Sequence, residues 1–280
     1  QSLNVVKMDE FRLLIDGHQT PARNMARDEA LLRRVIAGES PPCIRFYLWD
    51  PPGLSIGRFQ KIDHGVDMEA CMKHGVEVVR RLTGGEAVLH DDEITYSMII
   101  PFTHPGFDGR GVIDTYKTIS RALVKGLELT GVESTMAGEA PTRADPQGQG
   151  VCFYTPTVNE IVAHGRKIIG SAQTRDKLVI LQHGSIPIDW DIQKQFDVMG
   201  IPVENRELFA DMFMKRATTI SEQLEGKRPT FDELVRNFSK GFEEVFDMEL
   251  RPSEYSRPEQ KMSEHLIKTR YGNDSWNLKS

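Results

Sequence analysis

The chain has 280 residues, of which 39% are hydrophobic and 27% charged, a composition and length that suit one globular domain or two small ones. Its net charge of −6 argues against nucleic acid as a main partner, because neutralising phosphates requires clustered Lys and Arg. The sequence has no long apolar run and no signal-peptide core near its start, so we expect a cytoplasmic protein that is not inserted in a membrane.

The first predicted elements are a strand, a turn and a helix. Residues 11–15 form a short apolar run that ends at Asp16-Gly17, which predicts a strand followed by a turn. Thr20 and Pro21 are typical of an N-cap followed by proline at the first helical position, and apolar residues then recur at helical spacing. We therefore expect a helix that starts directly after Thr20.

Strands and helices are then predicted as far as residue 130. The sequence Asp-Pro-Pro-Gly at residues 50–53 is a strong breaker and separates two strands. In chain order, the expected elements are strands over residues 44–49 and 54–57, a helix over 67–74, strands over 77–81 and 94–100, and a helix over 115–130.

The middle of the chain is predicted to hold a long loop and three strands. Residues 138–150 are rich in Gly, Pro and Gln, and loops of this length inside compact domains are often functional. His164-Gly165 is typical of a hairpin turn between the first two strands that follow. The expected strands cover residues 157–163, 167–173 and 179–188.

The chain after Pro187 is predicted to be mainly helical. Thr230 and Glu233 form a capping box at the start of a helix over residues 230–246, and a further helical segment covers 257–271. Consecutive strands with helices before and after them are typical of an α+β fold with a mixed or antiparallel sheet. We expect a single domain over residues 1–280, of which 247–280 are a helical C-terminal extension.

The first candidate site is the stretch Arg-Arg-Leu-Thr-Gly-Gly-Glu-Ala-Val-Leu-His at residues 80–90. The paired glycines Gly84 and Gly85 leave the backbone bare, so that a ligand can lie against its N–H groups. Arg80 and Arg81 stand directly before this turn, and His90 closes the stretch. The alternative is a tight hairpin turn with a solvated arginine pair, which spacing alone favours.

The second candidate is Cys152, at the end of the glycine-rich stretch, where a cysteine can reach a ligand. The chain has two other cysteines, Cys43 and Cys71, and no CxxC pair, so we expect neither a disulfide framework nor a metal site. Cys43 opens an apolar strand and Cys71 lies on an amphipathic helix, which suits small buried hydrophobes. From its surroundings alone, Cys152 is open to the same interpretation.

The third candidate is the stretch Gly-Arg-Lys-Ile-Ile-Gly-Ser-Ala-Gln at residues 165–173, which begins a strand with Lys167. Gly170, Ser171 and Ala172 are small enough to permit close approach of another backbone or of a ligand. The alternative is an edge strand with a protective lysine, which is a common device against aggregation.

Together, these stretches resemble the lipoate/biotin protein ligase superfamily. Residues 80–90 are similar to its RRxTGGxxVxH lipoyl-binding signature, and residues 165–172 to the GxKxxGSA strand that carries the active-site lysine, here Lys167. The resemblance is clear over residues 11–188 and weaker in the tail. It implies the α+β catalytic-domain fold of that superfamily. The substrate-binding residues that it implies are Arg80, Arg81, Thr83, Gly84, Gly85, His90, Gly170, Ser171 and Ala172.

The position of the cysteine separates the branches of this superfamily. ATP-dependent lipoate ligases need no nucleophilic cysteine, and the widespread octanoyltransferase branch has its cysteine after the lysine, where this chain has none. Cys152 instead precedes Lys167 by 15 residues (167 − 152 = 15), as in the octanoyl-acyl carrier protein:protein N-octanoyltransferases of the Gram-positive type. Residues 43–49, 170–175 and 271–277 are also similar to that branch.

The resemblance thus implies an acyltransferase of protein lipoylation. Octanoyl-acyl carrier protein is the expected donor, Cys152 carries the acyl thioester, and Lys167 stabilises its thiolate. The expected acceptor is a lysine of a lipoyl-domain protein, with the glycine cleavage H protein as the family expectation. No cofactor and no ATP are expected. The alternatives are an octanoyl amidotransferase between lipoyl domains, an ATP-dependent lipoate-protein ligase, and a non-catalytic module that docks a carrier protein.

Overall fold

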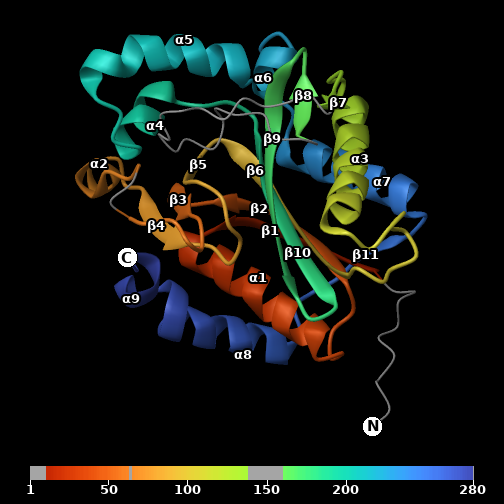
Figure 1. Cartoon of the computed structure of the whole chain (residues 1–280). Helices are drawn as coiled ribbons and strands as arrows, with labels where there is room; N and C mark the ends of the chain where they lie inside the picture. Colours follow the sequence, from red (N-terminus) through yellow and green to blue (C-terminus); the bar gives the residue numbers. More distant parts are fainter. Residues whose placement is uncertain (1–10, 63–64, 138–159, 280) are drawn as a thin grey trace.

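The computed structural model describes residues 11–62, 65–137 and 160–279. The described strands form a large sheet and a small sheet (Figure 1). The large sheet has, in spatial order, β11 (Leu250–Pro252), β1 (Phe11–Gln19), β2 (Cys43–Trp49), β6 (Glu93–Pro101), β10 (Val179–Pro187), β9 (Arg166–Asp176), β8 (Ile161–Ala163) and β7 (Thr135–Met136). The small sheet has, in spatial order, β4 (Glu77–Arg80), β3 (Gly53–Ile56) and β5 (Val88–His90).

The large sheet is mixed. β1 runs parallel to β2, which follows it through the helix α1 (Pro21–Ile36), and β11 is parallel to β1 on the other side. From β2 through β6, β10, β9, β8 and β7, neighbouring strands are antiparallel. The predicted α+β fold with a mixed sheet is therefore confirmed.

The predicted turn at Asp16-Gly17 is wrong. β1 continues through this pair, where a bulge shifts its register against β2. Gly17 has a φ of +59°, a conformation that glycine adopts without steric cost. The Asp16 carboxylate forms ion pairs with Arg27 and Arg45. Glycine with a positive φ is favoured both in turns and in bulges, but a bulge keeps the strand paired. The residues alone therefore did not distinguish the two.

Helices cover both faces of the large sheet (Figure 1). On one face, α3 (Val112–Thr130) and α7 (Phe231–Phe246) pack against each other and bury a core with the strands, in which Leu123 and Phe238 are fully buried. On the other face, α1 packs on the sheet and on α8 (Arg257–Leu266). The sheet is thus the middle layer of three.

The small sheet has a core of its own, shared with α2 (Met68–Lys73), α4 (Ile192–Val198) and α5 (Arg206–Arg216). β3 lies between β4 and β5, parallel to β4 and antiparallel to β5. The strands on either side of Gly84-Gly85 are therefore not paired with each other. The tight hairpin turn that spacing favours is wrong, and the glycines belong instead to a loop that passes the end of β3.

Several local predictions are confirmed. Thr20 caps α1, Thr230 and Glu233 form the capping box of α7, and β8 and β9 pair as a hairpin across His164-Gly165. The chain between β10 and α7 is mainly helical, as predicted. Besides α4 and α5, it contains η1 (Val203–Asn205) and α6 (Ile220–Gln223).

The loop predicted at 138–150 lies outside the described residues. Within the described ranges, no helix combines the length and apolar character needed to cross a membrane.

The C-terminal segment lies against both sheets. After β11 it forms α8, a π-helical turn at Ile267–Tyr271 and α9 (Asp274–Asn277). α8 packs on α1, and the Asn277 side chain accepts a hydrogen bond of 3.0 Å from the backbone N–H of Arg80 in β4. Residues 247–279 therefore support the strand that leads into the glycine-rich loop.

Candidate active site

A cavity with about 530 Å³ of empty space lies between the two sheets. Small-molecule sites combine mostly apolar walls with a few polar groups. Met25, Tyr47, Trp49 and Val88 supply apolar walls. The other lining residues are Ser55, Arg81, Gly85, His90, Thr95, Gly170, Ser171, Ala172, His183, Gly184 and Ser185. Such a lining suits a short hydrocarbon chain that ends in a polar group.

The cavity brings together two of the stretches singled out in the sequence. One wall comes from the glycine-rich loop and β5 of the small sheet, and the opposite part comes from β9 of the large sheet. Six predicted site residues line it: Arg81, Gly85, His90, Gly170, Ser171 and Ala172. Arg80, Thr83, Gly84 and Lys167 are not part of this lining.

Arg80 and Arg81 have different surroundings although they are neighbours. The Arg80 guanidinium is held by backbone carbonyl oxygens of residues 57–60 and of the C-terminal segment, with bonds of 2.8 Å to Gly57, 2.6 Å to Gln60 and 2.6 Å to Lys279. Arg80 is 1% exposed. It therefore joins β4 to two other segments rather than contacting the cavity.

Arg81 holds the glycine-rich loop at the cavity wall. Its guanidinium donates hydrogen bonds of 2.8 Å to the carbonyl oxygens of Ser55, Gly84 and Glu86, and one of 3.1 Å to the Ser55 hydroxyl. Gly85 has a φ of +95°, which a residue with a side chain rarely adopts. The loop is thus folded around a fixed cation, with its backbone open to the cavity.

Lys167 lies near the start of β9, three positions before Gly170. It is 3% exposed, and its Nζ donates a hydrogen bond of 2.6 Å to the Glu160 carboxylate. Cys152 lies outside the described residues. Within the described ranges, no group of three His, Cys, Asp or Glu side chains is placed to hold a metal ion.

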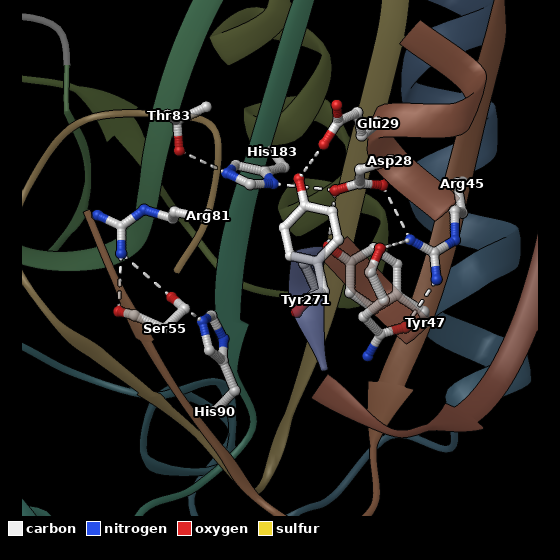
Figure 2. A network of polar contacts seen from close by, with 12 residues as sticks. Asp28, Glu29, Arg45, Tyr47, Ser55, Arg81, Thr83, His90, His183 and Tyr271 are labelled. Carbon is white, nitrogen blue, oxygen red and sulfur yellow. Dashed lines mark hydrogen bonds and ion pairs between the residues drawn. The ribbon is translucent and has the colours of Figure 1, made fainter. Parts of the chain in front are cut away.

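A histidine–carboxylate pair that sequence analysis missed connects α1, β10 and the glycine-rich loop (Figure 2). Asp28 Oδ2 lies 3.0 Å from His183 Nδ1, and His183 Nε2 lies 2.7 Å from the Thr83 hydroxyl. Asp28 and His183 are 155 residues apart in the sequence, and no local pattern relates them. Thr83, predicted to bind substrate, thereby ties the loop to the large sheet.

The charges of this pair follow from its surroundings. Burial alone would raise the pKa of Asp28, but the hydrogen bond from His183 and the charge of Arg45 lower it below its ordinary value. Burial lowers the pKa of His183, although the bond to Asp28 opposes the change. A carboxylate only accepts, so the neutral ring donates its Nδ1–H to Asp28, and its Nε2 accepts the proton of the Thr83 hydroxyl.

The second histidine–carboxylate pair is His90 with Glu93. His90 Nδ1 lies 2.9 Å from Glu93 Oε1, and His90 Nε2 lies 2.8 Å from the hydroxyl of Ser55. The His90 ring stacks on Trp49, with 4.1 Å between centroids and 9° between planes. The spacing of three residues between His90 and Glu93 was a usable sequence signal. Ser55 was not detectable, because the pairing of β3 with β5 brings it to His90.

Burial of His183 predicts a pH dependence of folding. The pKa of His183 lies below its ordinary value of 6.5 in the folded chain, so below pH 6.5 the unfolded chain binds a proton that the folded chain resists. As far as this histidine is concerned, the free energy of unfolding is therefore constant well above pH 6.5. It falls on acidification below pH 6.5, by up to about 1.4 kcal/mol per pH unit. His183→Gln should therefore lose stability less steeply than the wild type between pH 6.5 and about 5.5.

Urea unfolding at a series of pH values measures this effect. His265→Gln is the matched control, because His265 is exposed, and it should keep the wild-type slope. Equal slopes for the wild type and His183→Gln would contradict the prediction.

Comparison with known proteins assigns the fold. The family model "Lipoyl protein ligase A/B catalytic domain" matches residues 20–243. A structure of lipoate-protein ligase A bound with ATP superposes with a TM-score of 0.76 at 24% identity, covering 96% of this chain and 98% of that chain. A bi-partite lipoate protein ligase from Thermoplasma acidophilum gives 0.76 at 23% identity, with 96% of each chain covered. The fold is therefore that of the lipoate-protein ligases.

Two curated relatives narrow the assignment. The octanoyltransferase LipM of Brevibacillus brevis is 41% identical over 278 residues, which is 97% of this chain and 100% of the relative. The octanoyltransferase LipM of Bacillus subtilis is 41% identical over 280 residues, with 98% and 100% covered. The chain belongs to the lipoyl protein ligase A/B catalytic-domain family and, within it, to the LipM octanoyltransferases. The predicted superfamily and branch are confirmed.

Proposed function

We propose that this octanoyltransferase moves octanoyl from octanoyl-acyl carrier protein, through a thioester on Cys152, to a lysine of a lipoyl-domain protein. The glycine cleavage H protein is the first acceptor to test. The observation that supports this most directly is the cavity, where both lipoate-ligase motifs meet at an apolar wall. The names of the octanoyltransferase relatives indicate which acyl group is moved and that the reaction is a transfer.

The proposed chemistry has two steps. The Cys152 thiolate attacks the donor thioester, an exchange of one thioester for another that is nearly neutral in energy. The acceptor lysine then attacks the acyl-enzyme and forms the amide. Lys167 is the proposed cation beside the thiolate, since a thiol reacts through its thiolate form. The backbone N–H groups at Gly84-Gly85 or at Gly170-Ser171 are proposed to hold the negative oxygen that develops on the carbonyl.

The acyl chain is proposed to occupy the apolar part of the cavity, beside Met25, Trp49 and Val88. Octanoyl has about six methylenes, and burial of each contributes ~0.8 kcal/mol, which amounts to ~5 kcal/mol in favour of this length over short acyl groups. The proposed ligand contacts are Arg81, Gly85, His90, Gly170, Ser171 and Ala172. Arg80 and Thr83 are proposed to act by holding the loop that carries Arg81 and Gly85.

Transfer from octanoyl-acyl carrier protein is expected to proceed without ATP. The donor thioester is already activated, so no adenylate is needed to form the amide. The measurement is octanoylation of the H protein by mass spectrometry with octanoyl-acyl carrier protein, an octanoylated lipoyl domain, or free octanoate as donor, each with and without ATP. The carrier-protein donor should react fastest and equally in both conditions.

The other outcomes identify the alternatives. A faster reaction from the octanoylated lipoyl domain would make the protein an amidotransferase. Robust transfer from free octanoate that depends on ATP would place it with the ligases. Binding of the carrier protein without any acyl adduct or product would leave a docking module.

A further inference from the structure

Ser55, His90 and Glu93 form a hydrogen-bonded series that reaches the cavity. Ser55 lies between Arg81 and His90 in Figure 2, and both Ser55 and His90 line the cavity although each is buried. The order is hydroxyl, imidazole and carboxylate, at 2.8 Å and 2.9 Å. Such an order is used for proton transfer on several unrelated folds. The stacked Trp49 ring fixes the plane of the imidazole.

The direction of each hydrogen bond follows from the charge of Glu93. Burial alone would raise the pKa of this carboxyl, but its interaction with His90 and the hydrogen bonds from Ser185 and Thr95 lower it. A carboxylate only accepts, so His90 donates its Nδ1–H, and in the neutral ring Nε2 accepts the proton of the Ser55 hydroxyl. The Ser55 oxygen also accepts from Arg81 at 3.1 Å. A proton from the cavity therefore has a path to Nε2 through Ser55.

His90 is better placed for this task than His183. The charge of Asp28 is shared with Arg45 at 2.8 Å, and burial lowers the pKa of His183. His183 Nε2 is also directed at Thr83, which is not part of the cavity lining. Within the described chain, Glu93 accepts hydrogen bonds from His90 and from two hydroxyl groups, those of Thr95 and Ser185. Its charge is therefore available to stabilise a protonated His90.

We infer that His90, supported by Glu93, accepts through the Ser55 hydroxyl the proton that the attacking nitrogen loses when the amide forms. The inference rests on the proposed function, in which an amine attacks an acyl thioester. As the C–N bond forms, the nitrogen passes a proton to Ser55 Oγ while the proton of Ser55 moves to His90 Nε2. The C–S bond then breaks, and the departing thiolate takes a proton by the reverse path, which restores neutral His90.

The test follows deacylation alone, starting from octanoyl-enzyme of the wild type, His90→Gln and a matched control, His74→Gln. His74 also pairs with a carboxylate, Asp197 at 2.7 Å, but it is not part of the cavity lining. The nucleophiles are saturating acceptor protein and two small amines that do not dock, ethylamine and hydroxylamine. Circular dichroism and urea unfolding confirm that each variant is folded.

His90→Gln is expected to slow transfer to the acceptor protein and to ethylamine by about 100-fold or more, because a strongly basic nitrogen gives up its proton with difficulty. The loss with hydroxylamine should be less than about fivefold, because its protonated nitrogen loses a proton readily even to water. His74→Gln should match the wild type with all three nucleophiles. Glu93→Gln should repeat the pattern of His90→Gln, because an amide donor forces the ring proton onto Nε2.

Equal losses with ethylamine and hydroxylamine would reduce His90 to a structural role and overturn the inference, as would an unchanged rate with ethylamine. If the Ser55→Ala variant keeps the wild-type rate with ethylamine, the proton does not pass through the Ser55 hydroxyl. A wild-type enzyme that forms no octanoyl adduct, or acylates no lysine, would contradict the proposed function itself. That failure appears in the wild type and is therefore distinguishable from a failure of the role of His90.

Discussion

Replacement of Cys152 by alanine is expected to reduce octanoyl transfer to less than about one thousandth of the wild-type rate, because the acyl group then has no nucleophile to carry it. The other two cysteines cannot replace it. Burial raises the pKa of Cys43 to about 12 and that of Cys71 to about 11, so thiolate is scarce at both near neutral pH. Both are buried at positions that do not line the cavity.

Peptide mapping after incubation with octanoyl-acyl carrier protein measures the effect directly. The octanoyl mass should lie on the Cys152 peptide of the wild type and be absent from Cys152→Ala. Cys43→Ala and Cys71→Ala are the matched controls and should keep most of the activity. Octanoyl found on another residue, or rapid transfer by Cys152→Ala, would remove the covalent step from the proposed function.

Removal of the Lys167 ammonium is expected to have the second largest effect, a loss of transfer of about 100-fold or more. The buried ammonium is the proposed cation that favours the Cys152 thiolate. Substitution of this lysine alone also breaks its 2.6 Å ion pair with the buried Glu160 carboxylate, and breaking a buried ion pair from one side typically costs about 3–5 kcal/mol of stability. A loss of activity in Lys167→Ala would therefore mix catalysis with unfolding.

A double variant separates the two effects. Lys167→Met with Glu160→Gln replaces the ion pair by two neutral groups, and urea unfolding should show most of the wild-type stability. Its transfer rate should remain low, and alkylation of Cys152 by iodoacetamide should require a higher pH than in the wild type. Glu160→Gln alone is the control. Alkylation with an unchanged pH dependence in the double variant would show that Lys167 does not activate the cysteine.

Much of the local structure could be predicted because neighbouring residues specify it. Thr20 before Pro21 and the Thr230/Glu233 box start helices where predicted, since a cap satisfies N–H groups one turn away. The predictions that were wrong concern how strands continue and pair. Gly17 belongs to a bulge and Gly85 to a loop that passes the end of β3, yet either glycine would suit a turn equally well.

In the candidate site, too, some features could be predicted from neighbouring residues and others could not. The motif residues Arg81, Gly85 and His90 do line one cavity with residues of β9, and contiguous sequence was enough to single them out. Their neighbour Arg80 was indistinguishable from Arg81 by sequence. Its side chain instead joins three backbone segments, because it emerges where β4 meets the C-terminal residues.

The sequence by itself determined the family, its branch and the chemistry to look for, because contiguous motifs and the order of Cys152 and Lys167 carry that information. Tertiary structure alone decided which polar groups form hydrogen bonds at and behind the cavity wall. Ser55 reaches His90 through strand pairing, and Asp28 reaches His183 across 155 residues. Contacts of this kind depend on strand order and on helix packing. Both are set by burial of apolar surface over the whole chain and leave no local pattern to detect.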